Sequence, residues 1–505
     1  MRLTPFLAAL PAANAAAFQL PFKIPFFQSN KQEFQLPTNS ETRIAIIGAG
    51  AAGSSAAYWI SKAQERFSIP IDAVDVFEQA SYVGGRTVVY PYGNPTLPAV
   101  ELGASIFIPK NRNMWRAVDE FNLTRRDFQD EEGLGIWDGE KLLFTTTGGW
   151  WSYWDAAKAL LRYGFHSPRR TQKAVDGMVA KFLTLYSSQT PKWSKIEDLA
   201  TALDWDSLVS RNTVEWLKAE GVSDKFISEL VEASTRVNYG QNADEIHALE
   251  GACSLAPTGA VGVQGGNYQV FEQFLNRSGA NLYLNTTVKS IAPRSGKWKV
   301  VSDRGSETYT AVILGAPWHS SNIQLPAEIK IPVQPYVHLH VTLLSTTLAS
   351  LPAESLGLPS STKIPAMLLT TYEGARNGGK TPEFNSLSYH GKISDEEWVV
   401  KIFSKQRITD DWLNTMFNGQ VGWVHRKEWD AYPVLPPTST FPEVKLAPGL
   451  YYANSFEPFI STMETETISS RNIVDQLLAE HFNASICGAT DVIKDADDYV
   501  YGWDC

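Results

Sequence analysis

The sequence predicts an α/β protein in which a Rossmann-type dinucleotide-binding domain carries an inserted mixed α+β domain. Three observations predict this fold. A short apolar run enters a glycine-rich turn and a helix of small residues, a second apolar run ends in an acidic residue, and long stretches with other patterns interrupt this unit. We assign the dinucleotide-binding domain to residues 42–130, 240–320 and 445–482, and the inserted domain to residues 131–239 and 321–444.

The first element is a buried parallel strand over residues 43–47, and a helix is expected from Ser54 to about Ala63. The turn between them has the spacing Gly-x-Gly-x-x-Gly. Glycine lets the backbone approach a pyrophosphate, and the unpaired N–H groups at the helix start can bind it. The residues assigned to this contact are Gly48, Gly50, Ala51, Ala52 and Gly53.

A second strand is predicted over residues 71–77, and Glu78 follows it directly. An acid at this position can accept hydrogen bonds from the hydroxyl groups of an adenosine ribose. The alternative is a solvated acid at a strand end. Because strand, turn, helix and second strand come in the order that the contact requires, we predict a bound dinucleotide.

Composition excludes several other classes of protein. The chain has 505 residues, 44% of them hydrophobic and 19% charged, which is typical of a folded protein with a large core. Its net charge of −10 gives no basic surface for nucleic acid. The three cysteines, Cys253, Cys487 and Cys505, contain no Cys-x-x-Cys pair, so neither a zinc finger nor a dithiol redox site is expected.

The N-terminus has the features of a secretory signal peptide over residues 1–17, with Arg2, a short apolar run and Ala-x-Ala sites. An alanine-rich tail is the alternative. Residues 18–41 are expected to be a linker or pro-segment, and residues 483–505 a C-terminal tail. Four Asn-x-Ser/Thr sequons suit a glycosylated, secreted or luminal protein: Asn122, Asn276, Asn285 and Asn483. In that oxidising setting Cys487 and Cys505 are candidates for a disulfide bond.

The inserted domain offers little independent chemistry. Aromatic and aliphatic residues crowd positions 150–163, and are interpreted first as core and second as the wall of an apolar site. Arg162, Arg169, Arg170 and Lys173 form a basic cluster, for which a solvated face is favoured over an anionic membrane surface. His338 and His340 share one face of a predicted strand. With no third ligand nearby, strand packing is favoured and no metal site is predicted.

Several segments resemble the amine-oxidase-like superfamily of flavoproteins. Gly84-Gly85-Arg86 resembles the superfamily's doublet after the second strand, whose backbone and arginine face the phosphates. The segment from Glu101 to Ser105 resembles a stretch that passes near the flavin ring. The residues to which this resemblance assigns cofactor contacts are Gly84, Gly85, Arg86, Gly103 and Ala104.

Later segments resemble the same superfamily. The predicted strand over residues 285–291 resembles the one whose central valine, here Val288, touches adenine, and residues 309–317 resemble the strand that closes the nucleotide domain. A strand over residues 449–453 precedes a helix running to about Glu480. The resemblance implies that this helix directs its N-terminus at the flavin, through Ser461, Thr462, Met463 and Glu464. An ordinary helix cap is compatible with that role.

The approach to Gly265-Gly266-Asn267, taken with Gly-Gly-Arg and the start of the last helix, resembles the prenylcysteine oxidase (prenylcysteine lyase) family. The resemblance spans about residues 42–482. It implies FAD as cofactor and oxidative cleavage of a farnesyl- or geranylgeranyl-cysteine thioether by O2 and water, which yields a prenyl aldehyde, cysteine and H2O2. It also implies a lysosomal, vacuolar or secreted setting. It identifies no catalytic side chain.

Two alternatives stay open from the sequence. One is a flavin oxidase for another apolar amine or a terpenoid alcohol, although Ser455-Phe456 does not match the usual pair of an amine oxidase cage. The other is a carrier that binds FAD and an apolar ligand without turnover. The sequence leaves prenyl length, covalent attachment of the flavin, oligomeric state and peripheral membrane contact undecided.

Overall fold

The computed structural model describes residues 41–90, 99–127, 133–147, 153–488 and 498–505, and residues 41–505 group into one unit by their contacts. The predicted signal peptide and nearly all of the predicted linker lie outside the described residues. No helix within the described ranges combines the length and the apolar character needed to cross a membrane.

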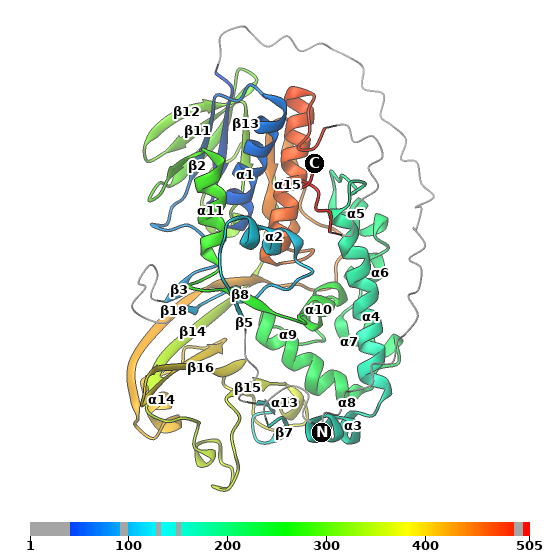
Figure 1. Cartoon of the computed structure of the whole chain (residues 1–505), viewed down its shortest axis with the longest axis vertical. Helices are drawn as coiled ribbons and strands as arrows, with labels where there is room; N and C mark the ends of the chain where they lie inside the picture. Colours follow the sequence, from blue (N-terminus) through cyan, green and yellow to red (C-terminus); the bar gives the residue numbers. More distant parts are fainter. Residues whose placement is uncertain (1–40, 91–98, 128–132, 148–152, 489–497) are drawn as a thin grey trace, which may run out of the picture. The chain divides into compact units, whose positions relative to one another are not determined.

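A six-stranded sheet in the order β19-β20-β13-β1-β2-β9 carries the predicted nucleotide unit (Figure 1). All of its pairings are parallel except that of β19, at one edge. The strands come from all three stretches that were assigned to the dinucleotide-binding domain. Their bounds are β1 Arg43–Ile47, β2 Ala73–Phe77, β9 Asn281–Tyr283, β13 Ala311–Leu314, β19 Lys445–Ala447 and β20 Leu450–Tyr452.

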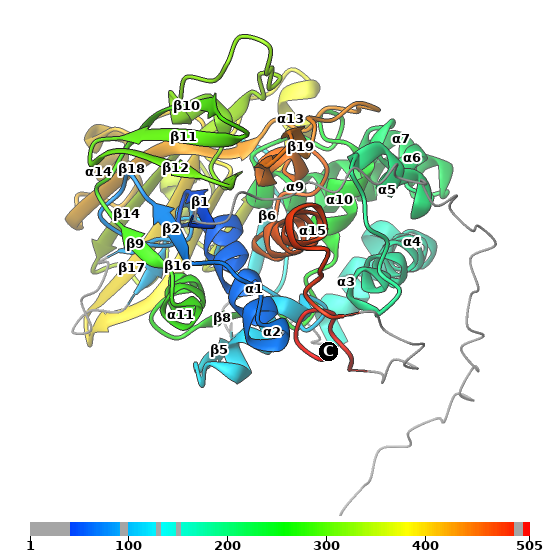
Figure 2. The same cartoon turned by 90° about the horizontal axis from the view of Figure 1, so that it is seen from above.

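The two faces of this sheet pack against different layers (Figure 2). Ile44 and Ile46 of β1 belong to a core shared with three helices, whereas Ala45 and Ile47 pack with a small antiparallel sheet, because successive side chains of a strand point to opposite faces. The helices are α1 Ala51–Phe67, α11 Tyr268–Ser278 and α15 Met463–Phe482. The small sheet is β10 Val288–Arg294, β11 Lys297–Ser302 and β12 Gly305–Tyr309.

A seven-stranded sheet in the order β18-β14-β17-β16-β15-β6-β7 comes from the two stretches that were assigned to the inserted domain. Its strands are β6 Leu134–Trp137, β7 Leu142–Thr145, β14 Tyr336–Thr346, β15 Met367–Thr370, β16 Ser386–Ser394, β17 Glu397–Ser404 and β18 Val421–Pro433. Two short ribbons connect the layers: β3 Val89–Tyr90 with β4 Val100–Glu101, and β5 Arg125–Asp127 with β8 Val261–Val263.

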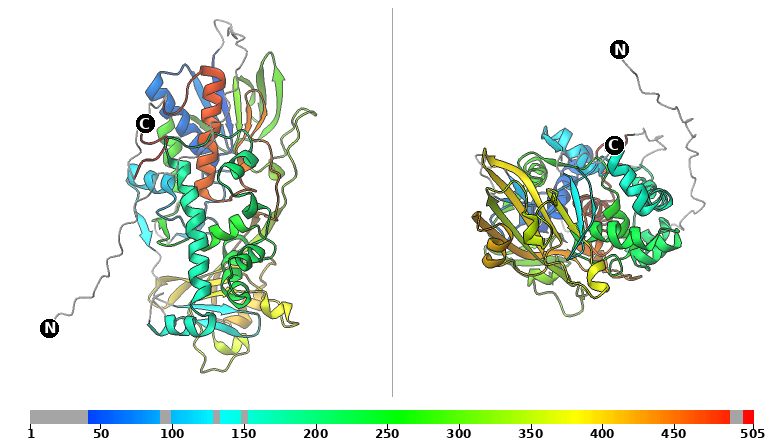
Figure 3. Two further views of the ribbon diagram at one scale, coloured as in Figure 1. Left: turned by 90° about the vertical axis from the view of Figure 1, so that its right-hand side faces the viewer. Right: turned by 90° about the horizontal axis from the view of Figure 1, so that it is seen from below.

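Helices dominate residues 153–255, and α4 is a long helix in this group (Figure 3). They are α3 Tyr153–Tyr163, α4 His166–Phe182, α5 Ile196–Ala202, α6 Asp206–Val209, α7 Thr213–Ala219, α8 Asp224–Phe226, α9 Glu232–Tyr239 and α10 Ala248–Leu255. The remaining helices are α2 Arg112–Glu120, α12 Trp318–Ser321, α13 Glu373–Arg376 and α14 Asp410–Met416.

The last residues are packed, although the sequence suggested a tail. Cys487 and Cys505 form the anticipated disulfide, and Cys253 is a free thiol. Arg471 of α15 donates to the Tyr501 carbonyl at 2.9 Å, and the Trp503 ring lies 5.2 Å from that of Tyr58 on α1. The C-terminus therefore covers the helical side of the nucleotide unit.

Two predicted strands differ from the structure by more than one or two end residues. The strand expected over residues 285–291 begins at Val288, because residues 285–287 form the turn that follows β9. It lies in the small antiparallel sheet and not in the six-stranded sheet. The strand expected from Tyr309 is broken at Thr310, so Tyr309 ends β12 and Ala311 begins β13.

Candidate functional site

A cavity of about 400 Å³ opens at the carboxyl ends of β1, β2 and β13, where open α/β sheets bind ligands. Ile47, Phe77 and Gly315 line it at these strand ends. The structure brings fourteen predicted contact residues to its wall: Gly48, Gly50, Ala51, Ala52, Glu78, Gly84, Gly85, Arg86, Gly103, Ala104, Val288, Ser461, Thr462 and Met463. Gly53 and Glu464 lie elsewhere.

The three glycines of the turn have different tasks. At Gly53 an added Cβ would lie 1.8 Å from the Gly48 carbonyl oxygen, so this glycine permits close packing of α1 on the turn. Gly48 has a φ of +104° and needs glycine for its backbone conformation. At Gly50 the nearest protein atom to an added Cβ is 3.9 Å away, at Gly85. Gly50 therefore leaves room in the cavity itself, which is what a bound pyrophosphate requires.

Glu78 connects the end of β2 to the glycine turn. One carboxylate oxygen accepts from the Ala49 N–H at 2.8 Å, and the other accepts from the Ala80 N–H at 2.7 Å. Burial raises the pKa of Glu78, although these backbone N–H groups act in the opposite direction. Each oxygen can accept a further hydrogen bond, so a contact to a ribose is compatible with this arrangement.

Arg86 is held against the cavity by partners that the sequence did not indicate. Its guanidinium pairs with Glu457, and Nη1 donates to the Ala431 carbonyl at 3.1 Å. Glu457 also accepts from the Tyr336 hydroxyl and from Asn454 Nδ2. These partners come from distant segments that carry no motif, so no local pattern announced them.

The segment around Glu101 and the segment around Asn267 are hydrogen-bonded to each other. Glu101 Oε1 accepts from the Asn267 N–H at 2.6 Å, and Asn267 Nδ2 donates to the Ala104 carbonyl at 2.9 Å. Burial raises the pKa of Glu101 to about 7. An added Cβ at Gly103 would lie 2.2 Å from the Arg86 carbonyl oxygen. The glycine-rich approach to Asn267 thus positions the cavity wall formed by Gly103 and Ala104.

The start of α15 faces the cavity, but one residue assigned to it does not. Thr462 is the N-cap and forms a reciprocal capping box with Thr465, so the helix start also has an ordinary cap. Glu464 is buried and accepts from the Asn113 N–H, the Met114 N–H and the Tyr186 hydroxyl. Its carboxylate therefore caps α2, and Glu464 lines a second, smaller cavity and not the first.

Glu466, one turn into α15, lines the cavity and was not indicated by any motif. Its side chain is 5% exposed, and neither carboxylate oxygen has a hydrogen-bond partner among the described residues. Burial raises its pKa to about 8, and the charge of Arg86 acts in the opposite direction. A buried polar group without a partner indicates that the cavity accommodates a ligand.

A second cavity, of about 140 Å³, shares wall residues with the first at the start of α15. Thr462 and Met463 line both. Apolar side chains dominate its wall: Ile106, Phe107, Ile108, Met178, Val179, Phe182, Tyr239, Cys253, Ala256, Pro257 and Ile460. Three come from α4, so part of the helical insert borders the site, whereas the described part of the aromatic stretch at 150–163 does not line this wall.

Behind this junction lies a buried acid. Glu250 accepts hydrogen bonds from the Ser461 N–H at 3.1 Å and from the Tyr239 hydroxyl, and burial raises its pKa to about 7. His247 accepts from the Glu250 N–H and stays neutral, because burial lowers its pKa to about 4. Tyr239 reaches the second cavity, so it connects Glu250 to that space.

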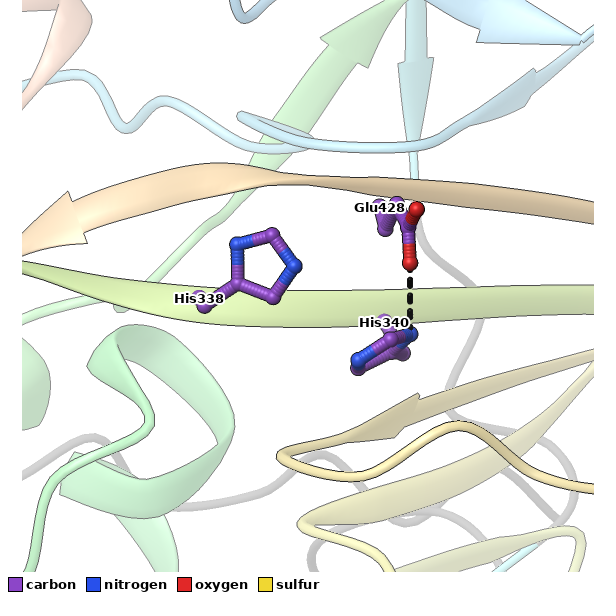
Figure 4. A group of neighbouring side chains, drawn as sticks. All are labelled: His338, His340 and Glu428. Atoms are coloured by element: carbon purple, nitrogen blue, oxygen red, sulfur yellow. Dashed lines mark ion pairs between the residues drawn. The ribbon is translucent and has the colours of Figure 1, made fainter.

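The two histidines of β14 lie on its solvent side and not in the core. His338 Nδ1 contacts Asp430 at 3.0 Å, and His340 Nδ1 lies 3.4 Å from Glu428 on the neighbouring β18 (Figure 4). The possible ligand atoms of His338, His340 and Glu428 lie within 4.8 Å of one another. The sequence missed these acids because they belong to a strand some 90 residues further on.

Two family models match the chain. That of an NAD(P)-binding Rossmann-like domain matches residues 46–121, and that of prenylcysteine lyase matches residues 147–491, more than half of the chain. This chain belongs to the prenylcysteine lyase family. The predicted resemblance is therefore confirmed, and the match covers nearly all of the insert that local motifs left without an assignment.

Relatives of this family are similar over most of their length. Farnesylcysteine lyase of Arabidopsis thaliana is 29% identical over 474 residues, which cover 90% of this chain and 91% of that protein. Prenylcysteine oxidase 1 of Homo sapiens is 32% identical over 472 residues, covering 87% and 89%.

Solved structures confirm the fold class. A putrescine oxidase variant superposes with a TM-score of 0.59 at 14% identity, covering 87% of this chain and all of that chain. Cyclohexylamine oxidase of Brevibacterium oxydans superposes with a TM-score of 0.56 at 14% identity, and the superposition covers 87% of this chain and 99% of that chain. This family member thus has the amine-oxidase fold. The fold, the Rossmann-like match and the glycine-lined cavity together indicate a flavin cofactor.

Proposed function

We propose that this chain is an FAD-dependent oxidase that cleaves the thioether of a farnesyl- or geranylgeranyl-cysteine. Water and O2 are co-substrates, and a prenyl aldehyde, cysteine and H2O2 are the products, which balances the reaction. The names of the relatives support the substrate class. The observation that carries the proposal is an apolar cavity that shares the wall residues Thr462 and Met463 with the nucleotide cavity.

The residues present suit FAD. The amide groups that begin α1 and the segment Gly84–Arg86 would hold the pyrophosphate, Glu78 the adenosine ribose, and the wall at Val288 the adenine. The start of α15 would lie at the ring, where its unpaired N–H groups favour negative charge. When bound, FAD supplies hydride acceptance and the return of electrons to O2.

The second cavity suits a prenyl chain. Its wall is mostly aliphatic and aromatic, and burial of apolar surface contributes about 25 cal/mol per Å². Because Thr462 and Met463 also border the nucleotide cavity, a chain seated here would place its sulfur-bearing carbon near the junction of the two spaces.

Tyr239 and Glu250 are suited to manage protons at this junction. Addition of water to the oxidised carbon releases a proton, and collapse of the resulting hemithioacetal returns one to sulfur. Glu250, with a pKa of about 7, can hold a proton at neutral pH, and Tyr239, whose hydroxyl is bonded to Glu250, lines the cavity. We assign Tyr239 as the group that passes the proton to and from Glu250.

A peroxide-release assay tests the proposal. Purified protein is incubated in air with farnesylcysteine, geranylgeranylcysteine, the corresponding alcohols and a set of apolar amines. We expect H2O2 and prenyl aldehyde in equal amounts from a prenylcysteine. Peroxide from amines or alcohols alone would favour an oxidase of another apolar amine or a terpenoid alcohol. If no donor bleaches the bound flavin in the absence of air, the protein is instead a carrier that binds FAD and an apolar ligand without turnover.

A secretory location belongs to the same proposal. The disulfide between Cys487 and Cys505 is compatible with an oxidising compartment, and the side chains of the sequon residues Asn122, Asn276, Asn285 and Asn483 are exposed. We propose that the protein is secreted or resides in the lumen of a vacuole or lysosome. Loss of mass on treatment with an endoglycosidase, for protein made in its own cell type, tests this.

A further inference from the structure

Helix α3 and the turn that follows it expose an apolar surface. Trp154, Leu160 and Leu161 of α3 are 79%, 52% and 88% exposed, and Phe165 in the turn is 55% exposed. The other large apolar side chains that the described residues expose are single in their elements: Phe67, Leu282, Val333, Met367 and Trp423. A cluster of this kind marks a contact surface more often than scattered side chains do.

Buried polar contacts fix the orientation of α3. Asp155 is buried and accepts from the Thr147 N–H at 2.9 Å. Arg162 donates twice to Glu229, at 2.6 and 2.8 Å, and the Tyr163 hydroxyl donates to Glu229 at 2.9 Å. Rotating the helix to hide Leu161 would break these contacts and leave buried charges unpaired, which is costly. The outward apolar face is therefore a built feature of the fold.

The same segment concentrates positive charge. Between Asp155 and Asp176 the chain has five basic residues and no acidic one, although its net charge is −10. Arg162 is engaged by Glu229 and Lys158 by Asp155, but Arg169, Arg170 and Lys173 are exposed on the first turns of α4. Apolar side chains flanked by exposed cations are typical of helices that lie in the interface of an anionic membrane.

We propose that α3 and the first turns of α4 dock this protein on an anionic lipid membrane, with Trp154, Leu161 and Phe165 entering the headgroup region. The favoured occupant is a lipid surface because the exposed cations complement acidic headgroups. The position of this surface also brings the second cavity close to the membrane. The same helix α4 continues to Met178, Val179 and Phe182 in the wall of the second cavity. At 1.5 Å per residue, Met178 lies about 8 Å along the helix axis from Lys173.

Vesicle co-sedimentation of the full protein tests this without using its activity, so the result is independent of the proposed reaction. We expect binding to phosphatidylcholine vesicles that contain phosphatidylserine, weaker binding without it, and weaker binding at high salt. Trp154→Ser with Leu161→Ser should reduce the partition coefficient about tenfold or more. Arg169→Glu with Lys173→Glu should reduce binding to the anionic vesicles to a similar extent.

Matched controls use exposed residues outside this surface. Val333→Ser removes an apolar side chain that is 86% exposed, and Lys363→Glu with Lys405→Glu reverses two exposed cations. Both should bind as the unaltered protein does. Equal binding by all variants, or no binding by the unaltered protein, would overturn the proposal. A third result would also overturn it: the unaltered protein does not bind vesicles but forms a dimer, and Leu161→Ser converts that dimer to a monomer. In that case a second copy of the chain covers the surface.

Discussion

The carboxylate of Glu78 accepts a hydrogen bond from the backbone N–H of Ala49 at 2.8 Å, so the end of β2 holds the glycine turn that follows β1. The second oxygen accepts from the Ala80 N–H, which fixes the loop after β2 as well. The residue that the sequence assigned to a ribose contact therefore also shapes the cavity before any ligand enters.

Replacing Glu78 by Ala should both destabilise the protein and weaken flavin retention. Two backbone N–H groups lose their acceptor, and a buried unpaired donor costs about 1–3 kcal/mol. Urea unfolding measures the first effect, and flavin absorbance per protein measures the second. Glu65→Ala is the control, because this side chain on α1 is 58% exposed and should change the free energy of unfolding little. Unchanged stability in Glu78→Ala would contradict the shaping role.

Gly50→Val should abolish flavin retention while the protein still folds. The nearest protein atom to an added Cβ is 3.9 Å away, so the valine side chain would occupy ligand space without displacing backbone. Absorbance in the flavin band and far-ultraviolet circular dichroism check the two halves of this prediction. A purified variant with full flavin absorbance would refute it.

Two other glycines separate a cofactor effect from a folding effect. Gly53→Ala should prevent folding, since its Cβ would lie 1.8 Å from the Gly48 carbonyl oxygen. Gly177→Ala, in the exposed middle of α4, meets nothing within 4 Å and should leave stability the same or slightly higher. If Gly53→Ala folds as well as Gly177→Ala, the assigned tasks of the turn glycines are wrong.

Local pattern explains which parts of the site were predictable. The strand of residues 43–47, its glycine turn and Glu78 lie within some 35 residues and follow one periodic order, so the sequence identified them. Glu457, Glu466 and Glu250 act through partners brought from other elements, and an isolated acid in a helix or loop carries no such signal. Glu464 lines the smaller cavity and not the larger one, because a helix start does not reveal which side faces which space.

Tyr239→Phe should lower turnover about 10²-fold or more while flavin content stays unchanged, because the hydroxyl passes a proton to Glu250. In the unaltered protein, kcat/KM should rise with pH through about 7 as Glu250 ionises, and Glu250→Gln should lose that rise. Tyr389→Phe is the control, since its buried hydroxyl has no hydrogen-bond partner among the described residues. Full activity in Tyr239→Phe would exclude the assignment.

In protein that has been freed of cofactor, Glu466→Gln should raise the free energy of unfolding, and the increase should be larger at higher pH. Burial raises the pKa of Glu466 from 4.5 to about 8, so between these values the folded state keeps a proton that the unfolded chain releases. The free energy of unfolding therefore falls as pH rises across this window. The neutral amide of glutamine removes this loss of stability. The gain in the free energy of unfolding is at most roughly 4–5 kcal/mol near pH 8 and is small near pH 4.5. Urea unfolding at both ends of the window measures it, with the exposed Glu65→Gln as control. A difference between Glu466→Gln and the unaltered protein that is the same at both pH values would show that the carboxyl does not hold a proton in the cavity.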